Sequence, residues 1–128
     1  MTLQVELAVP DGEVWAGSAE MVIAKTLEGD IGVLTGHAPV LGILAEGSVV
    51  RIRPGEGAEE ISAAVSSGFF SIADDRVSIL ARQAQLSSGI DRAAVQAALD
   101  AELGDSGQEE SAQARYYRAQ LAAAGAGS

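Results

Sequence analysis

The stretch that decides the fold is SGFFSIADDRVSILARQA, residues 67–84, because it combines a turn with the alternation of a β-strand. The adjacent aspartates Asp74 and Asp75 are typical of a tight turn between strands. Val77 and Ile79, which follow them, recur at the period-two spacing of a half-buried strand. This stretch therefore predicts β-structure with short turns.

The same alternation runs through the chain before this stretch. Leu3, Val5 and Leu7 alternate with polar residues, and Met21 and Ile23 continue the pattern. Residues typical of turns separate these segments at positions 10–12, 28–30 and 54–57. Short strands at this spacing predict an antiparallel β-sandwich or barrel over residues 1–85.

The pattern changes after residue 89, where the sequence becomes rich in alanine. Ile90, Ala94 and Ala98 recur at helical spacing. We expect residues 104–107 to break this helix, and Ser106 and Glu109 have the Ser-x-x-Glu form of a capping box that opens a second helix over residues 109–124. Helices of this length are marginal alone in water, so residues 86–128 are predicted to form a helical hairpin that leans on another part of the molecule and can move.

Composition limits the classes of function. The 128 residues are 48% hydrophobic, which fits one compact domain with an appendage. The net charge of -10 argues against nucleic acid or anionic lipid as a partner. The chain has no cysteine, no signal-peptide pattern at its start and no uncharged run long enough to span a bilayer. We therefore expect a cytoplasmic protein that associates with a membrane only through another protein.

Motifs for catalysis and metal binding are missing from the sequence. The only lysine, Lys25, lies outside any phosphate-binding Gly-x-x-x-x-Gly-Lys motif, and the glycines at 29, 32 and 36 lack dinucleotide-binding spacing. The only histidine, His37, has no nucleophile elbow, cysteine or second histidine to work with. His37 is either a catalytic base or a residue at a strand corner, where Pro39 keeps Ala38 extended. We predict no catalytic residue and no metal site.

Two segments, in this order along the chain, resemble motifs of one known family, the epsilon subunits of bacterial F-type ATP synthases. The first lies within GDIGVLTGHAPVLGIL, residues 29–44, and the second lies within residues 67–84. The matching positions are Gly29, Gly32, Val33, Leu34, His37 and Pro39 in the first, and Gly68, Phe69, Val77, Ile79, Leu80 and Ala81 in the second. Thr35 and Ser67 depart from the family pattern, which usually has proline and often glycine there. The resemblance covers residues 2–103.

The resemblance implies a non-catalytic subunit of the central stalk that couples the gamma subunit to the ring of c subunits during proton-driven ATP synthesis. It implies a peripheral position at the cytoplasmic face of the bacterial cell membrane. It also implies two contact regions. The expected contact with the c ring is Glu28, Gly29, Asp30, Ile31 and Gly32, and the expected contact with gamma is His37, Pro39 and Leu41.

In bacterial members of the family the hairpin resembles a brake. Folded against the sandwich it permits turnover, and extended toward the catalytic alpha and beta subunits it inhibits ATP hydrolysis. Here Arg115 and Arg118 would meet acidic segments of beta. Some relatives stabilise the folded hairpin with ATP through an Ile-Asp-x-x-Arg-Ala motif.

In this chain Ala94 replaces the arginine of that motif, which leaves Asp91 and Arg92 as nucleotide candidates. We therefore expect ATP binding to be weak or absent and no cofactor to be required. Two other interpretations stay open: a stand-alone β-sandwich that binds a ligand or a protein, and a small enzyme that uses His37. A His37→Ala variant distinguishes the enzyme, because it would lose turnover but keep its fold and its partners.

Overall fold

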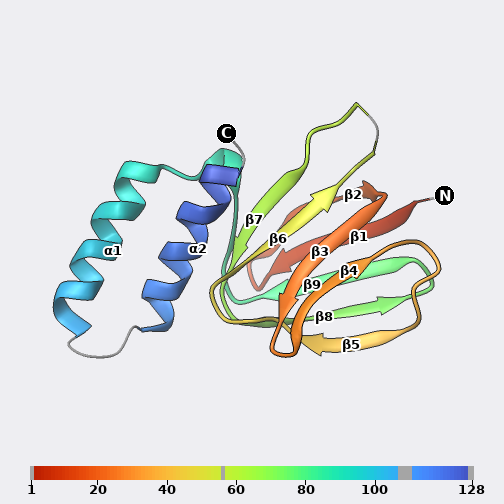
Figure 1. The fold of residues 1–128 in the computed structure, drawn as a ribbon, viewed down its shortest axis with the longest axis horizontal. Helices are drawn as coiled ribbons and strands as arrows, with labels where there is room; N and C mark the ends of the chain where they lie inside the picture. The colour runs from red at the N-terminus through yellow and green to blue at the C-terminus, as the bar shows by residue number, and fades with distance from the viewer. Residues whose placement is uncertain (1, 56, 107–110, 127–128) are drawn as a thin grey trace.

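The computed structural model describes residues 2–55, 57–106 and 111–126, which form two five-stranded sheets and a pair of helices (Figure 1). The first sheet has the order β2-β1-β9-β8-β5, and the second has the order β10-β7-β6-β3-β4. The strands of the first sheet are β1 (Leu3–Val9), β2 (Gly12–Ala19), β5 (Val40–Ile43), β8 (Gly68–Ala73) and β9 (Arg76–Ala81). Those of the second are β3 (Met21–Thr26), β4 (Gly29–Val33), β6 (Ser48–Arg53), β7 (Ile61–Val65) and β10 (Ala84–Leu86).

The predicted β-sandwich is confirmed. Paired strands run antiparallel, with the exception of β1 and β9, which are parallel. Alternate residues of each strand meet between the sheets, and the core contains Leu3, Leu7, Ile52 and Ile79. Asp74 and Asp75 both have positive φ, 51° and 59°, as the tight turn between β8 and β9 requires.

Strand β3 exists as predicted, but its buried residues are not Met21 and Ile23, whose alternation predicted the strand. Val22 and Ala24 are buried in the core, whereas Met21 and Ile23 are only half-buried on the outer side. A period-two pattern defines a strand without saying which face points inward when both faces carry apolar residues. Ile23 is covered in part because it lines a groove beside the second helix of the hairpin.

The C-terminal part is a helical hairpin, made of a short 3-10 turn η1 (Ser87–Gly89), α1 (Arg92–Ser106) and α2 (Ala112–Ala126). The predicted break at residues 104–107 begins later than expected, because α1 continues through Gly104 and ends at Ser106. Ser106, the first residue of the predicted capping box, is therefore the last residue of α1. The remaining residues of that motif, 107–109, lie outside the described residues. The cap of α2 is Ser111, whose Oγ accepts a hydrogen bond of 3.0 Å from the amide of Ala114.

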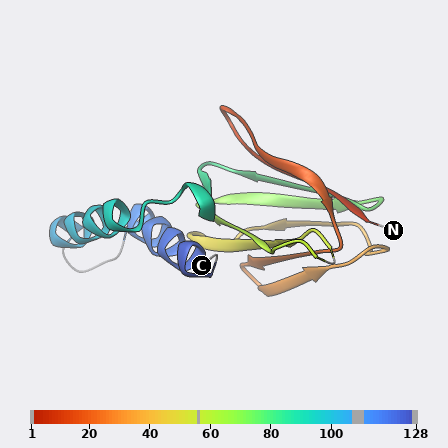
Figure 2. The ribbon, with the colours of Figure 1, turned by 90° about the horizontal axis from the view of Figure 1, so that it is seen from above.

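Helix α2 lies between α1 and the sandwich, and packs on the outer side of β6 and β7 (Figures 1 and 2). Tyr116, Ala119 and Ala123 of α2 form a small cluster with Ala64 of β7. The hairpin therefore leans on the second sheet, as its marginal length requires. The division into residues 1–85 and 86–128 stays a prediction, and β10 extends the second sheet to Leu86. None of the described helices is long and apolar enough to cross a membrane.

Candidate partner-binding surface

Exposed apolar side chains gather around β5, the edge strand of the first sheet. Leu41 and Ile43 point outward from β5 and are 75% and 59% exposed. Ile43 pairs in register with Phe69 of β8, which pairs with Leu80 of β9, so these three side chains form one row on the outer face. Leu27, 68% exposed, extends the row around the edge, because its amide donates to the Ile43 carbonyl at 3.2 Å. We call Leu27, Leu41, Ile43, Phe69 and Leu80 the apolar strip.

The apolar strip borders a shallow groove of about 620 Å³ on the first sheet, lined also by Pro10 and Arg82. Single exposed leucines are ordinary on protein surfaces, but a contiguous apolar patch usually marks a contact with another protein. Aromatic and aliphatic residues with a polar rim are typical of such contacts. The strip is therefore the best candidate for a partner-binding surface among the described residues.

Gly42 explains why β5 can present this strip. A side chain at Gly42 would point inward and collide with the ring of Phe70, which fills the core beneath β5. Glycine lets the strand lie directly on that ring, and the alternation of the strand then directs Leu41 and Ile43 to the outside.

The loop before β5 holds His37 at a corner that is fixed by backbone contacts. The amide of His37 donates to the Leu34 carbonyl at 3.2 Å, across a turn in which Gly36 has φ of 81°. The amide of Gly36 donates to Asp75 Oδ1 at 2.7 Å, which fastens the loop to the turn between β8 and β9. His37 Nδ1 lies 2.7 Å from the Ala38 carbonyl oxygen, so this nitrogen donates. The histidine is half-buried and bound to backbone, which agrees with the corner interpretation.

Three of the contact residues expected from the sequence, Glu28, Ile31 and Leu41, line one groove. Residues 28–32 form the turn and strand at the tip of the β3–β4 hairpin, where Thr26 Oγ1 donates to the Gly29 carbonyl at 2.8 Å. Strands β4 and β5 are edge strands of the two sheets, and one groove between them is lined by Glu28, Ile31, Leu41 and Ile43. Pro39 is exposed at the entrance to β5.

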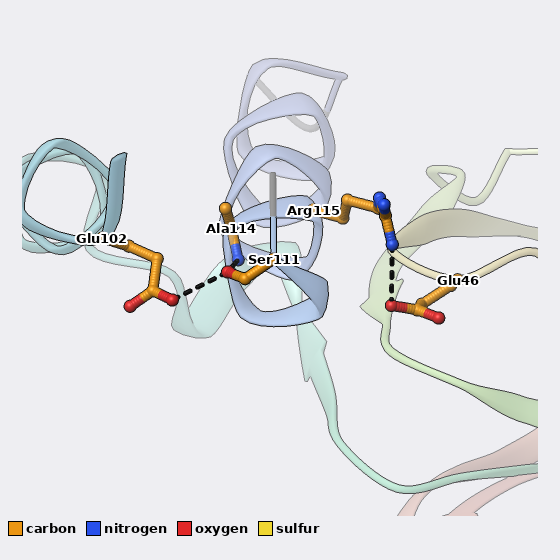
Figure 3. Close-up of polar contacts among 5 residues, drawn as sticks. All are labelled: Glu46, Glu102, Ser111, Ala114 and Arg115. Atoms are coloured by element: carbon orange, nitrogen blue, oxygen red, sulfur yellow. Dashed lines mark hydrogen bonds and ion pairs between the residues drawn. The ribbon is translucent and has the colours of Figure 1, made fainter. Parts of the chain in front are cut away.

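The arginines of α2 lie against the sandwich. Arg115 Nη1 is 3.1 Å from Glu46 Oε1, and both side chains are partly exposed (Figure 3). Arg118 lines a groove of about 380 Å³ together with Asp30, Lys25 and Arg51. The structure therefore brings Arg118, expected to meet beta, beside Asp30, expected to meet the c ring. Sequence reasoning did not predict that Lys25 of β3 and Arg51 of β6 would line the same groove.

The two nucleotide candidates lie at the start of α1. Asp91 Oδ1 accepts a hydrogen bond of 3.2 Å from the amide of Ala94, so the carboxylate caps the helix. Arg92 is the first residue of α1 and is exposed.

Burial in the contact between α2 and the sheet raises the pKa of Tyr116 above its ordinary value of 10.0.

Sequence reasoning found Leu41 and missed most of the apolar strip. Phe69 and Leu80 were matched as motif residues without a role, and Leu27 and Ile43 were not singled out. The available signal is their parity, because Phe69 and Leu80 occupy strand positions next to the buried Phe70 and Ile79 and so must face outward.

The comparisons with known proteins agree with this architecture. Residues 2–87 match the family model described as ATP synthase, Delta/Epsilon chain, beta-sandwich domain. The ATP synthase epsilon chain of Thermobifida fusca is 52% identical over 108 residues, which is 80% of this chain and 79% of the relative. That of Streptomyces griseus is 48% identical over 113 residues, 88% of each chain.

Solved structures share the fold at low sequence identity. A chain of the Euglena gracilis mitochondrial ATP synthase, in a structure of OSCP, F1 and c ring, has a TM-score of 0.71 at 23% identity, covering 94% of this chain and 75% of its own. A chain of the central stalk and c ring structure from Tetrahymena thermophila mitochondrial ATP synthase has a TM-score of 0.60 at 18% identity, covering 97% and 91%.

A β-sandwich that exposes an apolar strip and carries a helical hairpin defines a protein that works through contacts with other subunits. The chain belongs to the ATP synthase delta/epsilon chain family, as one of the epsilon chains of the bacterial enzyme. It is a non-catalytic subunit of that synthase.

Proposed function

We propose that this chain couples the gamma subunit to the c ring in the central stalk during proton-driven ATP synthesis. The observation that carries the proposal is the apolar strip around β5. It offers an apolar contact for gamma that continues into His37, Pro39 and Leu41, while residues 28–32 of the neighbouring β3–β4 hairpin offer a contact for the loops of the c ring through Glu28 and Asp30. Both lie on the same edge of a rigid sandwich.

Rigidity supports this role because torque must pass from one partner to the other. The core residues between the two sheets are almost completely buried, and the His37 loop is fastened to the β8–β9 turn through Asp75. Partners held on one packed body move together, whereas partners joined by a flexible segment would slip. The protein acts at the cytoplasmic face of the bacterial cell membrane, as a peripheral part of the synthase.

The hairpin regulates ATP hydrolysis in this proposal. It inhibits hydrolysis when it leaves the sandwich and brings Arg115 and Arg118 to acidic segments of the catalytic beta subunits. ATP binds the hairpin weakly or not at all, because Ala94 replaces the motif arginine and Asp91 is engaged as the cap of α1.

The test of coupling measures how much purified gamma is captured by the tagged chain. It compares the unaltered chain with a double variant that carries Leu41→Glu and Ile43→Glu. Two buried carboxylates without partners at an interface cost several kcal/mol, so affinity for gamma should fall at least tenfold. Leu103→Glu, which adds a charge to α1 away from the strip, is the matched control and should bind normally. Unchanged capture by the double variant would move the gamma contact elsewhere.

A further inference from the structure

The groove of about 620 Å³ beside the apolar strip has a small residue at its floor. Ala8 of β1 is in register with Leu80 of β9, so it continues the row of the apolar strip on the outer face of the first sheet. Leu80 is 41% exposed, whereas Ala8 is only 8% exposed. A methyl group therefore stands where the next residue of the row carries a large side chain, and the surface is hollowed at that point.

One wall of this groove is the end of the β1–β2 hairpin, at Val9 and Pro10. The register of the two strands shifts between Leu7 and Ala8, and Val14 of β2 is left without a partner in β1. An extra residue of this kind is a β-bulge, which bends its strand and increases the local twist. In Figure 2 the hairpin rises away from the other strands of the sandwich. The bulge therefore raises a wall beside the row.

One charged side chain lies at the rim of the groove. Arg82 follows the end of β9 and is exposed, and it is the only charged residue among the described residues that line the groove. Its amide donates to the Ser67 carbonyl at 2.9 Å, which fixes the backbone from which the side chain extends. An arginine stays charged beside apolar surface and offers a planar fork of donors to a carboxylate. The rim therefore favours an acidic group, although the chain as a whole has a net charge of -10.

The shape and the charge of the groove define what it can hold. Its volume of about 620 Å³ lies within the range of pockets that bury a whole small ligand, so a bulky apolar side chain fits. Such a side chain would remove exposed surface of Phe69 and Leu80 from water. Because Phe69 and Leu80 belong to the apolar strip as well as to the groove, the occupant is part of the protein that covers the strip.

We propose that the groove over Ala8 is an anchor pocket: the partner that covers the apolar strip inserts one bulky apolar side chain there and places a carboxylate on Arg82. Ala8 sets the depth of the pocket and so determines how large an anchor it accepts. Single side chains seated in pockets contribute much of the binding energy at protein interfaces. That the partner is gamma rests on the proposed function.

The first experiment fills the pocket. Ala8→Phe places a ring where the anchor would sit, and Ala73→Phe is the matched control, because Ala73 is exposed on the same outer face at the far end of β8. The affinity of the full chain for purified gamma, measured by titration calorimetry, should fall about tenfold or more in Ala8→Phe and stay nearly unchanged in Ala73→Phe. Urea unfolding followed by Trp15 fluorescence checks folding. Ala8→Leu, a smaller change, should give an intermediate loss and serves if Ala8→Phe does not fold.

The second experiment reverses the charge at the rim. Arg82→Glu is compared with Arg76→Glu, the same change at an exposed position at the other end of β9. At low salt Arg82→Glu should weaken binding of gamma about tenfold, and the loss should shrink at about 0.5 M salt, because salt screens exposed charges. Arg76→Glu should bind nearly as the unaltered chain does. Equal binding by the two variants overturns the contact between Arg82 and a carboxylate.

The double variant of the strip, Leu41→Glu with Ile43→Glu, separates failure of the pocket from failure of the proposed function. If the double variant loses gamma while Ala8→Phe and Ala8→Leu keep it, the gamma contact stands and the anchor pocket is overturned. If the double variant and the Ala8 variants all bind gamma normally, both the gamma contact at the strip and the pocket are overturned. Loss of binding in the double variant and in Ala8→Phe, with normal binding by Ala73→Phe, is the result expected.

Discussion

At the scale of single residues, Asp75 has more influence than its exposed position suggests. It lies in the β8–β9 turn, yet its carboxylate accepts the Gly36 amide from a loop 39 residues away. That loop carries His37 and leads to Pro39 and β5, which form part of the proposed gamma contact. A hydrogen bond to a charged acceptor contributes about 1.5–3 kcal/mol when well protected and less when exposed.

We therefore predict that Asp75→Gly loosens the loop and that Asp75→Asn does not. Glycine keeps the positive φ of the turn but removes the acceptor, whereas asparagine keeps both. Amide exchange at Gly36 should become about tenfold faster in the glycine variant, with weaker capture of gamma. Asp74→Gly, the neighbouring turn position with the same positive φ, is the control. Equal exchange in all three variants would contradict the role given to Asp75.

Tyr116 gives a second prediction at this scale, because it reports docking of α2. Its raised pKa means that the docked state favours the neutral phenol. The stabilisation is fully present below pH 10 and is lost as the pH rises through the raised pKa. In Tyr117→Phe, where Tyr116 is the only tyrosine, absorbance of tyrosinate should therefore appear at higher pH in the folded chain than in the same variant unfolded in urea. Identical titration curves would show that burial by docking does not hold the phenol neutral.

At the scale of elements, the start of α2 shows how a helix finds its boundary. A Ser-x-x-Glu pattern begins at residue 106, but Ser106 is the last residue of α1, and Ser111 caps α2. Gly104 costs about 1 kcal/mol inside a helix, and the packing of α1 along α2 offsets that cost.

A substitution at residue 111 should therefore lower the stability of α2, whereas a substitution at residue 106 should not. Ser111→Ala removes the acceptor for the Ala114 amide and the bond to Glu102, so we expect a loss of about 1 kcal/mol in the stability of α2, measured as lower helicity by circular dichroism. Ser111→Asp retains an acceptor at the cap and should restore most of it. A larger loss in Ser106→Ala would favour the original capping box.

Strand β5 gives the other prediction at this scale. Gly42→Ala introduces a methyl group against the Phe70 ring, whereas the same change at Gly32 meets only the flexible end of Met21. Overpacking of this kind costs about 1–3 kcal/mol. Urea unfolding followed by Trp15 fluorescence should show that loss in Gly42→Ala and little change in Gly32→Ala. Equal stability of the two variants would mean that β5 is not seated on the ring.

At the scale of the whole molecule, local patterns predicted the kinds of element and the family, but not how distant parts meet. Alternation at Leu3, Val5 and Leu7 was sufficient for a strand, and the order of motifs was sufficient for the family. Local alternation cannot show that β1 pairs with β9, or that Glu46 meets Arg115 across 69 residues. The apolar strip was missed for the same reason, since its row is assembled from β5, β8 and β9 by register.

The parallel pairing of β1 with β9 also governs when the protein can fold. The N-terminal strand lies inside the first sheet, between β2 and a strand that ends at Ala81. A nascent chain on the ribosome therefore carries an unpaired, apolar β1 edge until almost two thirds of the protein has been made. Unfinished chains that stop before Ala81 should aggregate and be degraded quickly, whereas chains that stop after the sandwich should fold stably without the hairpin.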